Sequence, residues 1–240
     1  MNDSKIIPVS ILGTALVVSA LVFGAFYYSA QSVVPGDALS VTGSTKTRVT
    51  SDQAKLTINF ARVVFVDDLA SGYRDIAKDL LLTKELLQNS GIAPTDIIEA
   101  PVSMYQNYDP TNSGKIQYQL SQTITIQSND VNKLTEISKN IPSLAEKGAV
   151  VSVGALEYYY SKLPDLRVSL LSEAVKDAKA RAEKIAQGTD RHVGGVQSAS
   201  SGVVQVMSPN SIDVADYGSY DTSSIEKDVM VTVKASFELR

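Results

Sequence analysis

The sequence predicts an α+β protein in which an N-terminal transmembrane helix precedes largely antiparallel sheet, with helices packed on one face. The chain of 240 residues contains a long uncharged apolar run near its N-terminus. Beyond it, segments that alternate apolar and polar residues, as half-buried strands do, are interspersed with segments whose apolar residues recur every three or four positions, as in helices. The central segments follow the order strand, helix, strand, strand, helix, strand, which is that of a split βαβ, or ferredoxin-like, unit.

The apolar run covers residues 6–28 and contains no charged residue. At about 1.5 Å per residue, a helix of this length crosses the roughly 30 Å hydrocarbon core of a bilayer. Lys5 precedes the run and the next basic residue is Lys46, so the positive-inside rule places the tail, residues 1–5, in the cytoplasm. The rest of the chain is then extracytoplasmic, and the lipid bilayer is a predicted partner through this single span.

A cleaved signal peptide is the alternative interpretation of the run, with Ala30-Gln31-Ser32 as a small-residue cleavage site. The apolar region of a signal peptide has about 7–15 residues, so the longer run favours an uncleaved anchor. Pro35-Gly36-Asp37 ends the helix within a linker, residues 29–39, and residues 40–240 form the predicted extracytoplasmic domain.

Seven segments of this domain have the two-residue period of strands. A turn-rich loop separates the third from the fourth, which is typical of an antiparallel hairpin. The pattern leaves open whether the strands form one sheet or two. The predicted strands are residues 40–48, 53–66, 96–105, 115–127, 149–160, 193–207 and 227–239.

Three segments have the helical period. The first is capped by Asp67 or Asp68, runs for about six turns and ends near Gly91, where a left-handed cap is expected. The second contains Pro142, which is expected to bend or break it. The second and third helices are predicted at residues 131–147 and 164–187.

The composition excludes several kinds of site. The chain has no cysteine, which excludes disulfides, thiol nucleophiles and thiolate metal sites, and its net charge of −4 argues against a nucleic-acid partner. His192 is the only histidine, which excludes a metal site built on several histidines, and we interpret it as a loop residue near a helix end. Gly194-Gly195 lacks the Gly-Lys-Ser/Thr ending of a phosphate loop. We therefore predict no catalytic residue, no cofactor and no metal, and we do not expect an enzyme.

The excess of tyrosine indicates an interaction surface. The chain has 11 tyrosines and no tryptophan. A tyrosine combines a rigid apolar ring with a polar tip, which suits a surface that binds a partner. The alternative is the ordinary preference of strands for tyrosine. The candidate surface residues are Tyr105, Tyr108, Tyr118, Tyr217 and Tyr220.

Two further patterns have a structural and a functional interpretation. Carboxylates in the polar segment 208–226 have the oxygen ligands that calcium prefers, but not the regular spacing of a calcium loop, so a solvated, mobile loop is favoured. The longest helix has an alanine-rich stripe, which predicts close packing on a sheet. The carboxylates are Asp213, Asp216, Asp221 and Glu226, and the stripe consists of Leu170, Ala174, Ala178, Ala182, Ile185 and Ala186.

From residue 39 to residue 240 the chain resembles the SIMPL-domain family of mostly bacterial extracytoplasmic proteins, which includes the periplasmic immunogenic proteins. Several landmarks of that family occur here in the right order, although Ser44, Ser51 and Gln117 depart from its usual residues. The landmarks are Val41-Thr42-Gly43 with Asp52-Gln53-Ala54, Gly91-Ile92-Ala93 with Asp96-Ile97, the loop 105–114, Tyr118-Gln119-Leu120-Ser121, the alanines of the long helix with Gly188, and Gly194.

The resemblance implies a secreted or anchored protein. Some family members assemble into large ring-like oligomers and some are linked to stress tolerance, but the family has no agreed catalytic residues. The leading hypothesis is thus a membrane-anchored interaction or structural module that self-associates and contributes to envelope stress tolerance; its protein partner is unknown. The alternative is an uncharacterised enzyme or small-ligand-binding protein that uses a cleft between the sheet and the hairpin loop.

Overall fold

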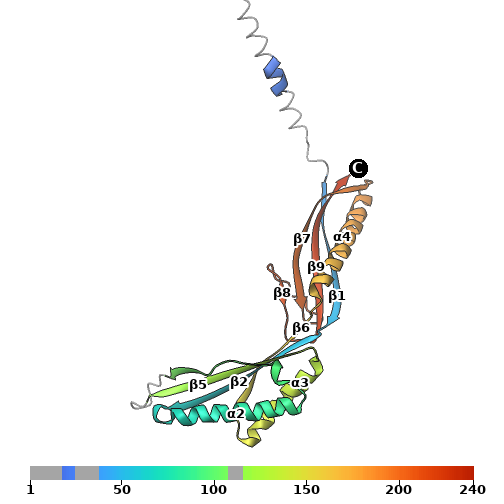
Figure 1. Ribbon diagram of the computed structural model, residues 1–240. Helices are drawn as coiled ribbons and strands as arrows, with labels where there is room; N and C mark the ends of the chain where they lie inside the picture. Colours follow the sequence, from blue (N-terminus) through green and yellow to red (C-terminus); the bar gives the residue numbers. More distant parts are fainter. Residues whose placement is uncertain (1–17, 25–37, 108–115) are drawn as a thin grey trace, which may run out of the picture. The chain divides into compact units, whose positions relative to one another are not determined.

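A computed structural model describes residues 18–24, 38–107 and 116–240 of the chain (Figure 1). The described residues form parts of two compact units. The first unit contains residues 38–43, 175–201 and 233–240, and the second contains residues 44–174 and 202–232.

A five-stranded antiparallel sheet lies in the second unit. Its strands follow the order β3-β5-β2-β6, and β4 also pairs with β5. With the two helices between them, these strands give the split βαβ order that the sequence predicted. The strands are β2 (Gln53–Phe65), β3 (Ile97–Glu99), β4 (Ser103–Asn107), β5 (Gln117–Ser128) and β6 (Val151–Tyr159).

The strand predicted at residues 96–105 is two short strands, β3 and β4, and the prediction of one continuous strand is wrong. Pro101 lies between them and has no backbone N–H to donate to a neighbouring strand. Ala100 still contacts β5, because its N–H donates to the carbonyl of Thr123 at 2.9 Å and its own carbonyl accepts from Nε2 of Gln122 at 2.9 Å.

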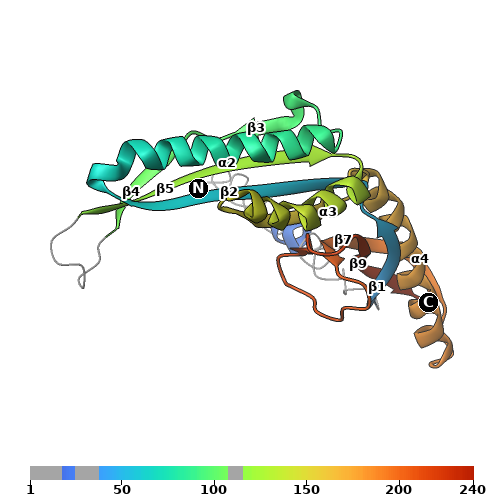
Figure 2. The same ribbon diagram turned by 90° about the horizontal axis from the view of Figure 1, so that it is seen from below.

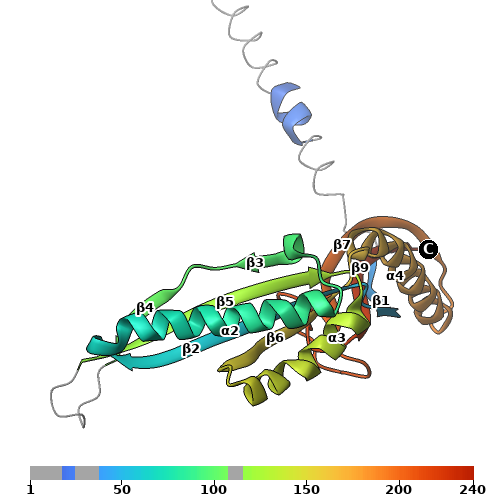
Figure 3. The ribbon, with the colours of Figure 1, turned by 60° about the horizontal axis from the view of Figure 1, so that its bottom comes forward.

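Helices α2 (Leu69–Asn89) and α3 (Val131–Asn140) lie on the same face of this sheet (Figure 2 and Figure 3). Helix α2 starts directly after Asp68, although that side chain accepts no hydrogen bond from the first turn. Asp130 does cap α3, since its side chain accepts from the N–H of Lys133 at 2.9 Å. Short 3₁₀ helices occur at Val66–Asp68, Pro94–Asp96 and Ile141–Lys147.

The predicted break at Pro142 is confirmed, because α3 gives way there to the 3₁₀ helix. Gly91 and Gly148 follow the two helical segments with φ angles of +79° and +80°, the left-handed conformation that favours glycine. The apolar faces of both helices and the sheet form one core. Its fully buried members include Leu56, Ile58, Phe60, Ile76, Leu87, Leu120, Ile124, Ile126, Leu134 and Ile141.

A second sheet has the strand order β1-β9-β7-β8, so the strands form two sheets. Helix α4 packs on it through two apolar clusters. In the second unit Leu170 contacts a cluster with Val206, Val229 and Val231, and in the first unit Ala178 and Ala182 pack with Ala235 and Phe237. The elements are β1 (Ala38–Thr50), α4 (Leu163–Gln187), β7 (Val193–Met207), β8 (Ser219–Tyr220) and β9 (Glu226–Leu239).

The alanine stripe of α4 is buried as predicted, except at Ile185, whose side chain is 48% exposed. Four residues turn an α-helix by about 400°, so a stripe with four-residue spacing winds around the helix. The buried series with this spacing ends at Ala186, which is 1% exposed, and Ile185 lies about 100° around the helix from Ala186. The prediction that Ile185 packs on the sheet is therefore wrong.

Most of the predicted membrane span, residues 6–28, lies outside the described residues, and so does the linker up to residue 37. Within the span, residues 18–24 are helical. In the part of the chain that the structure describes, no helix combines the length and the apolar character needed to cross a bilayer.

Candidate functional site

The segment between β7 and β9, residues 208–225, is the candidate site, and a buried carboxylate holds its first part. The side chain of Asp228 on β9 is 3% exposed and accepts hydrogen bonds from Nε of Arg48 at 2.9 Å and from Nζ of Lys46 at 3.2 Å. It also accepts from the backbone N–H of Asn210 at 3.0 Å. The hydrogen bond from Arg48 holds the pKa of Asp228 well below its usual range.

A buried amide holds the middle of the 208–225 loop. Gln205 on β7 is 4% exposed, and its Nε2 donates to the carbonyl of Ala215 at 2.6 Å. Its Oε1 accepts from the hydroxyl of Ser219 at 2.8 Å and from the N–H of Ala215 at 3.4 Å. The side chain thus bonds to the loop backbone as a neighbouring strand would, and it fixes the position of Ala215.

A buried lysine holds the last part of the 208–225 loop. Lys227 is 0% exposed, and its ammonium group donates to the carbonyl of Ser224 at 2.7 Å and to that of Asp221. The ammonium also lies 5.7 Å from the ring centre of Tyr220. Burial lowers the pKa of Lys227, although the negative charge of Asp221 opposes the change.

Asp221 organises the turn that Lys227 closes. Its carboxylate accepts from the N–H groups of Ser223 at 3.0 Å and Ser224 at 3.3 Å, and from the hydroxyls of both residues. Burial tends to raise the pKa of Asp221, but the hydrogen bonds from Ser223 and Ser224 outweigh burial and lower the pKa to about 2.

Between these anchors the 208–225 loop has three large apolar side chains that are more than half exposed. Ile212 is 90% exposed, Val214 is 65% exposed and Tyr217 is 97% exposed. Asp213 and Asp216 lie between them, so this stretch carries apolar and acidic groups together. Neighbouring exposed apolar side chains on a soluble domain are typical of a surface that binds a partner. Anchoring at buried groups lowers the ordering cost of binding, because part of the backbone is already fixed.

The 208–226 loop is solvated over much of its length, as predicted, and buried polar groups in addition anchor it at three points. The calcium interpretation gains no support. Asp221 is engaged with serine groups and lies 3.9 Å from the ammonium of Lys227. Among the described residues no group of three or more histidine, cysteine, aspartate and glutamate side chains is placed to hold a metal ion.

The predicted tyrosines occupy different environments. Tyr105 on β4 is 65% exposed and lies opposite Gln119, whereas Tyr118 on β5 lies opposite Gln106. Successive side chains of a strand point to opposite faces, so Tyr105 and Tyr118 do not share a surface. Tyr108 lies outside the described residues.

Tyr217 and Tyr220 also differ. The hydroxyl of Tyr220 accepts from the N–H of Tyr160 at 2.9 Å, and its ring centre lies 5.8 Å from that of Tyr159. Tyr220 therefore helps to fix the loop, whereas Tyr217 is presented to solvent. Sequence reasoning missed Ile212 and Val214 beside it. The signal that was present is the occurrence of large apolar residues, without strand or helix period, in a segment that is otherwise polar.

His192 is exposed in the turn between α4 and β7, as predicted. Its backbone N–H donates to the carbonyl of Arg240 at 2.8 Å, and its carbonyl accepts from the N–H of Arg240 at 2.8 Å. Gly194 and Gly195 lie within β7. A Cβ on Gly194 would come within 2.9 Å of Oε2 of Glu238, which gives this glycine a packing role.

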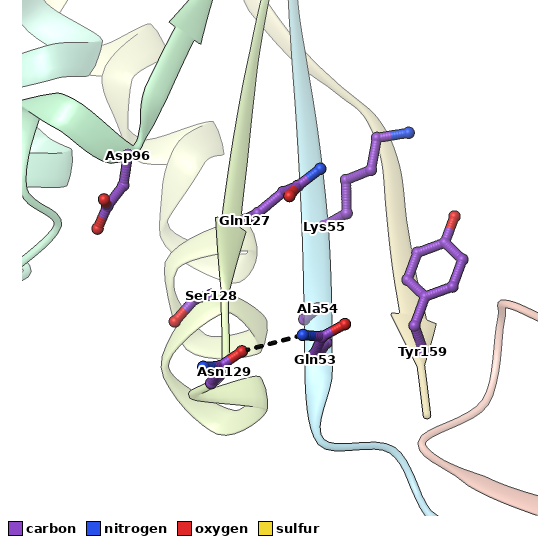
Figure 4. Close-up of a pocket in the computed structure, with 8 residues that line it drawn as sticks. All are labelled: Gln53, Ala54, Lys55, Asp96, Gln127, Ser128, Asn129 and Tyr159. Atoms are coloured by element: carbon purple, nitrogen blue, oxygen red, sulfur yellow. Dashed lines mark hydrogen bonds between the residues drawn. The ribbon is translucent and has the colours of Figure 1, made fainter. Parts of the chain in front are cut away.

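A polar hollow of about 610 Å³ lies at the end of the five-stranded sheet (Figure 4). Nε2 of Gln53 donates to Oδ1 of Asn129 across it at 3.4 Å, and Lys55 forms an ion pair with Glu157 at 3.0 Å. The hollow is lined by Gln53, Ala54, Lys55, Asp96, Gln127, Ser128, Asn129 and Tyr159.

This hollow differs from the ligand cleft that the sequence suggested. It adjoins Ser128, the last residue of β5, whereas the hairpin loop precedes the first residue of that strand, Gln117. Small-molecule pockets are mostly lined by apolar and aromatic side chains, with a few polar groups that set orientation. The lining here is mainly amide, hydroxyl and charged groups. The hollow is therefore a weaker candidate than the 208–225 loop.

Comparison with known proteins places most of the chain in one family model. The model described as SIMPL, a protein of unknown function (DUF541), matches residues 39–237. No curated protein matches the chain. Among solved structures, a crystal structure of a hydrolase from Listeria innocua aligns with 82% of this chain and 92% of its own, at 8% identity and a TM-score of 0.19. A likeness of that degree carries no argument about fold or activity.

Proposed function

The chain belongs to the SIMPL family of proteins of unknown function, and we propose that it is a membrane-anchored, extracytoplasmic interaction module that works by self-association. The observation that carries the proposal is the 208–225 loop, in which Ile212, Val214 and Tyr217 are exposed between buried anchors. Such a loop offers apolar area for binding a partner.

The location is part of the same proposal. Residues 6–28 form the single-pass anchor, the N-terminus is cytoplasmic and the domain faces away from the cytoplasm, as the apolar run and Lys5 suggest. Protease added to cells with a permeabilised outer layer should digest the domain and leave an N-terminal tag protected. Protection of the domain would contradict the orientation, and a mature chain that starts after residue 32 would show a cleaved signal. A contribution to envelope stress tolerance is the corresponding physiological proposal.

The self-association is tested by changing the exposed side chains of the loop. The double variant Ile212→Ser and Tyr217→Ser removes the two most exposed apolar groups and leaves the anchors at Asp228, Gln205 and Lys227 in place. We expect the dissociation constant of self-association, measured by sedimentation velocity, to rise about tenfold or more. A central apolar side chain contributes about 1.4 kcal/mol or more to the binding free energy, which corresponds to that factor.

A matched control is Val168→Ser on α4, which removes a side chain that is 70% exposed outside the loop. Its dissociation constant should equal that of the unchanged chain. An equal effect of the control and the loop variant, or no effect of the loop variant, would contradict the role of the loop.

A further inference from the structure

A groove of about 560 Å³ lies between strand β1 and helix α4, within the first unit. Val41, Ala180 and Ile185 give it an apolar floor, and Ile185 is 48% exposed there although it is a large apolar residue on a charged helix. The groove is lined by Val41, Thr42, Ala180, Arg181, Lys184 and Ile185.

The rim of the groove is positively charged. Arg181 and Lys184 lie on it, and Arg181 forms an ion pair with Asp177 one turn earlier, at 2.8 Å. Asp177 therefore offsets part of the positive charge of the two basic side chains on this side of α4.

Strand β1 adds an open edge to the groove. Among the described strands, β1 is at the end of the order β1-β9-β7-β8 and has one neighbour, β9. The outer edge of such a strand presents backbone N–H and C=O groups to any extended segment that approaches it. Residues 38–45 contain neither a charge nor a proline, the devices that usually protect an edge. A groove between an edge strand and a helix is a common form of peptide-binding site.

We propose that this groove binds the 208–225 loop of a second copy of the chain, an inference that rests on the proposed self-association. The two surfaces have complementary chemistry. The loop carries the acidic Asp213 and Asp216 among exposed apolar side chains, and the groove carries basic side chains beside an apolar floor. Ile212 and Val214 are two residues apart, so in an extended segment both side chains enter the groove from one side, while the side chain of Asp213 points to the opposite side. Each copy offers one loop and one groove.

The proposed contact is heterologous, because two different surfaces meet. Such a contact repeats from copy to copy and produces a ring when the rotation closes, or a filament when it does not. Pairing of β1 with β1 of a second copy is the competing arrangement. It would be isologous and would bring the basic rims of two α4 helices toward each other, which is unfavourable for like charges.

Mixing two full-length variants tests this geometry. The groove variant is Ile185→Glu, the loop variant is Ile212→Lys, and both change exposed side chains, so the fold should persist. Each variant alone should lose the large assembly in a mild detergent, as measured by light scattering. Mixed, they should form a 1:1 dimer and nothing larger, because the intact loop of the groove variant meets the intact groove of the loop variant. Val168→Glu, on the same helix outside the groove, is the control and should assemble like the unchanged chain.

Each outcome bears on one claim. If the unchanged chain assembles and both variants still do, the loop and the groove are not the contact, while self-association stands. If only the groove variant loses assembly, the edge of β1 pairs with a second β1 and the proposal is wrong. If each variant alone is monomeric and the mixture is monomeric too, the loop and the groove do not bind each other. If the unchanged chain is a monomer at every concentration, the proposed function itself fails.

Cysteine cross-linking provides a second readout, because the chain contains no cysteine of its own. Ala180→Cys places a thiol in the groove and Val214→Cys places one in the loop. Oxidation of an equimolar mixture should give a cross-linked dimer of one copy of each variant. The pair Val168→Cys with Val214→Cys should not, and equal yields from the two pairs would overturn the proposal.

Discussion

Asp221→Asn is expected to weaken the fold by removing the charge that organises the turn around Lys227. The pKa of this carboxylate in the folded chain is about 2, against an ordinary value of 3.8. Each pKa unit corresponds to about 1.4 kcal/mol, so the lowered pKa contributes roughly 2 kcal/mol to the free energy of unfolding near pH 7. The variant should lose about that amount.

The contribution of Asp221 to stability depends on pH. Because the pKa of Asp221 is lower in the folded state than in the unfolded state, its contribution is complete above about pH 5 and is lost as the pH falls through about 4 toward 2. Urea unfolding of both chains, followed by circular dichroism, should give a difference of about 2 kcal/mol at pH 7 and roughly half of it at pH 3. A difference that does not change with pH would show that the charge of Asp221 does not stabilise the turn.

Asp75→Asn is a matched control for this experiment. Asp75 is an exposed aspartate on α2, outside the turn around Lys227. Its replacement should change the free energy of unfolding by no more than about 0.5 kcal/mol at pH 7. An effect as large as that of Asp221→Asn would show that the loss of any one negative charge, and not the hydrogen-bonded turn, decides the result.

Three other experiments test the packing and the absence of a histidine site. Ala178→Leu should lower the free energy of unfolding by about 1–3 kcal/mol, because it overpacks a fully buried position. Lys179→Leu, on the exposed side of α4, should change it by no more than about 0.5 kcal/mol. Equal effects of the two variants would contradict the orientation of the helix. Gly72→Ala should lower the melting temperature, since a Cβ there would lie 2.8 Å from Cδ1 of Leu120, and an unchanged melting temperature would show that the contact relaxes freely. His192→Ala should leave stability and assembly unchanged, and loss of assembly at unchanged stability would reopen the enzymatic alternative.

Local patterns predicted most of the elements. The strand predicted at residues 193–207 has the same ends in the structure, and the long helix predicted at 164–187 begins one residue earlier. These ends depend on glycine, proline and the period of apolar residues, which are all local. The break between β3 and β4 also has a local cause, Pro101. It was not predicted, because apolar and polar residues alternate on both sides of that proline. The number of sheets depends on pairing between distant strands, which period alone does not determine.

The candidate site was predictable only in part. Tyr217 was identified because its residue type is common at binding surfaces. The anchors that hold its loop were not identified, since Arg48 reaches Asp228 across 180 positions of the sequence and Gln205 reaches Ala215 through a side chain. Lys227 and Asp228 are charged yet buried side by side in β9, and the alternating pattern of that strand gave no sign of their partners.

The mass of the unchanged full-length chain in solution shows whether the protein self-associates. One copy has a mass of 25.7 kDa. Light scattering in a mild detergent, with the detergent contribution subtracted, should give a multiple of that mass that rises with protein concentration to a limit. A mass of one copy at every concentration would contradict self-association, and with it the pairing of the 208–225 loop with the groove of a second copy.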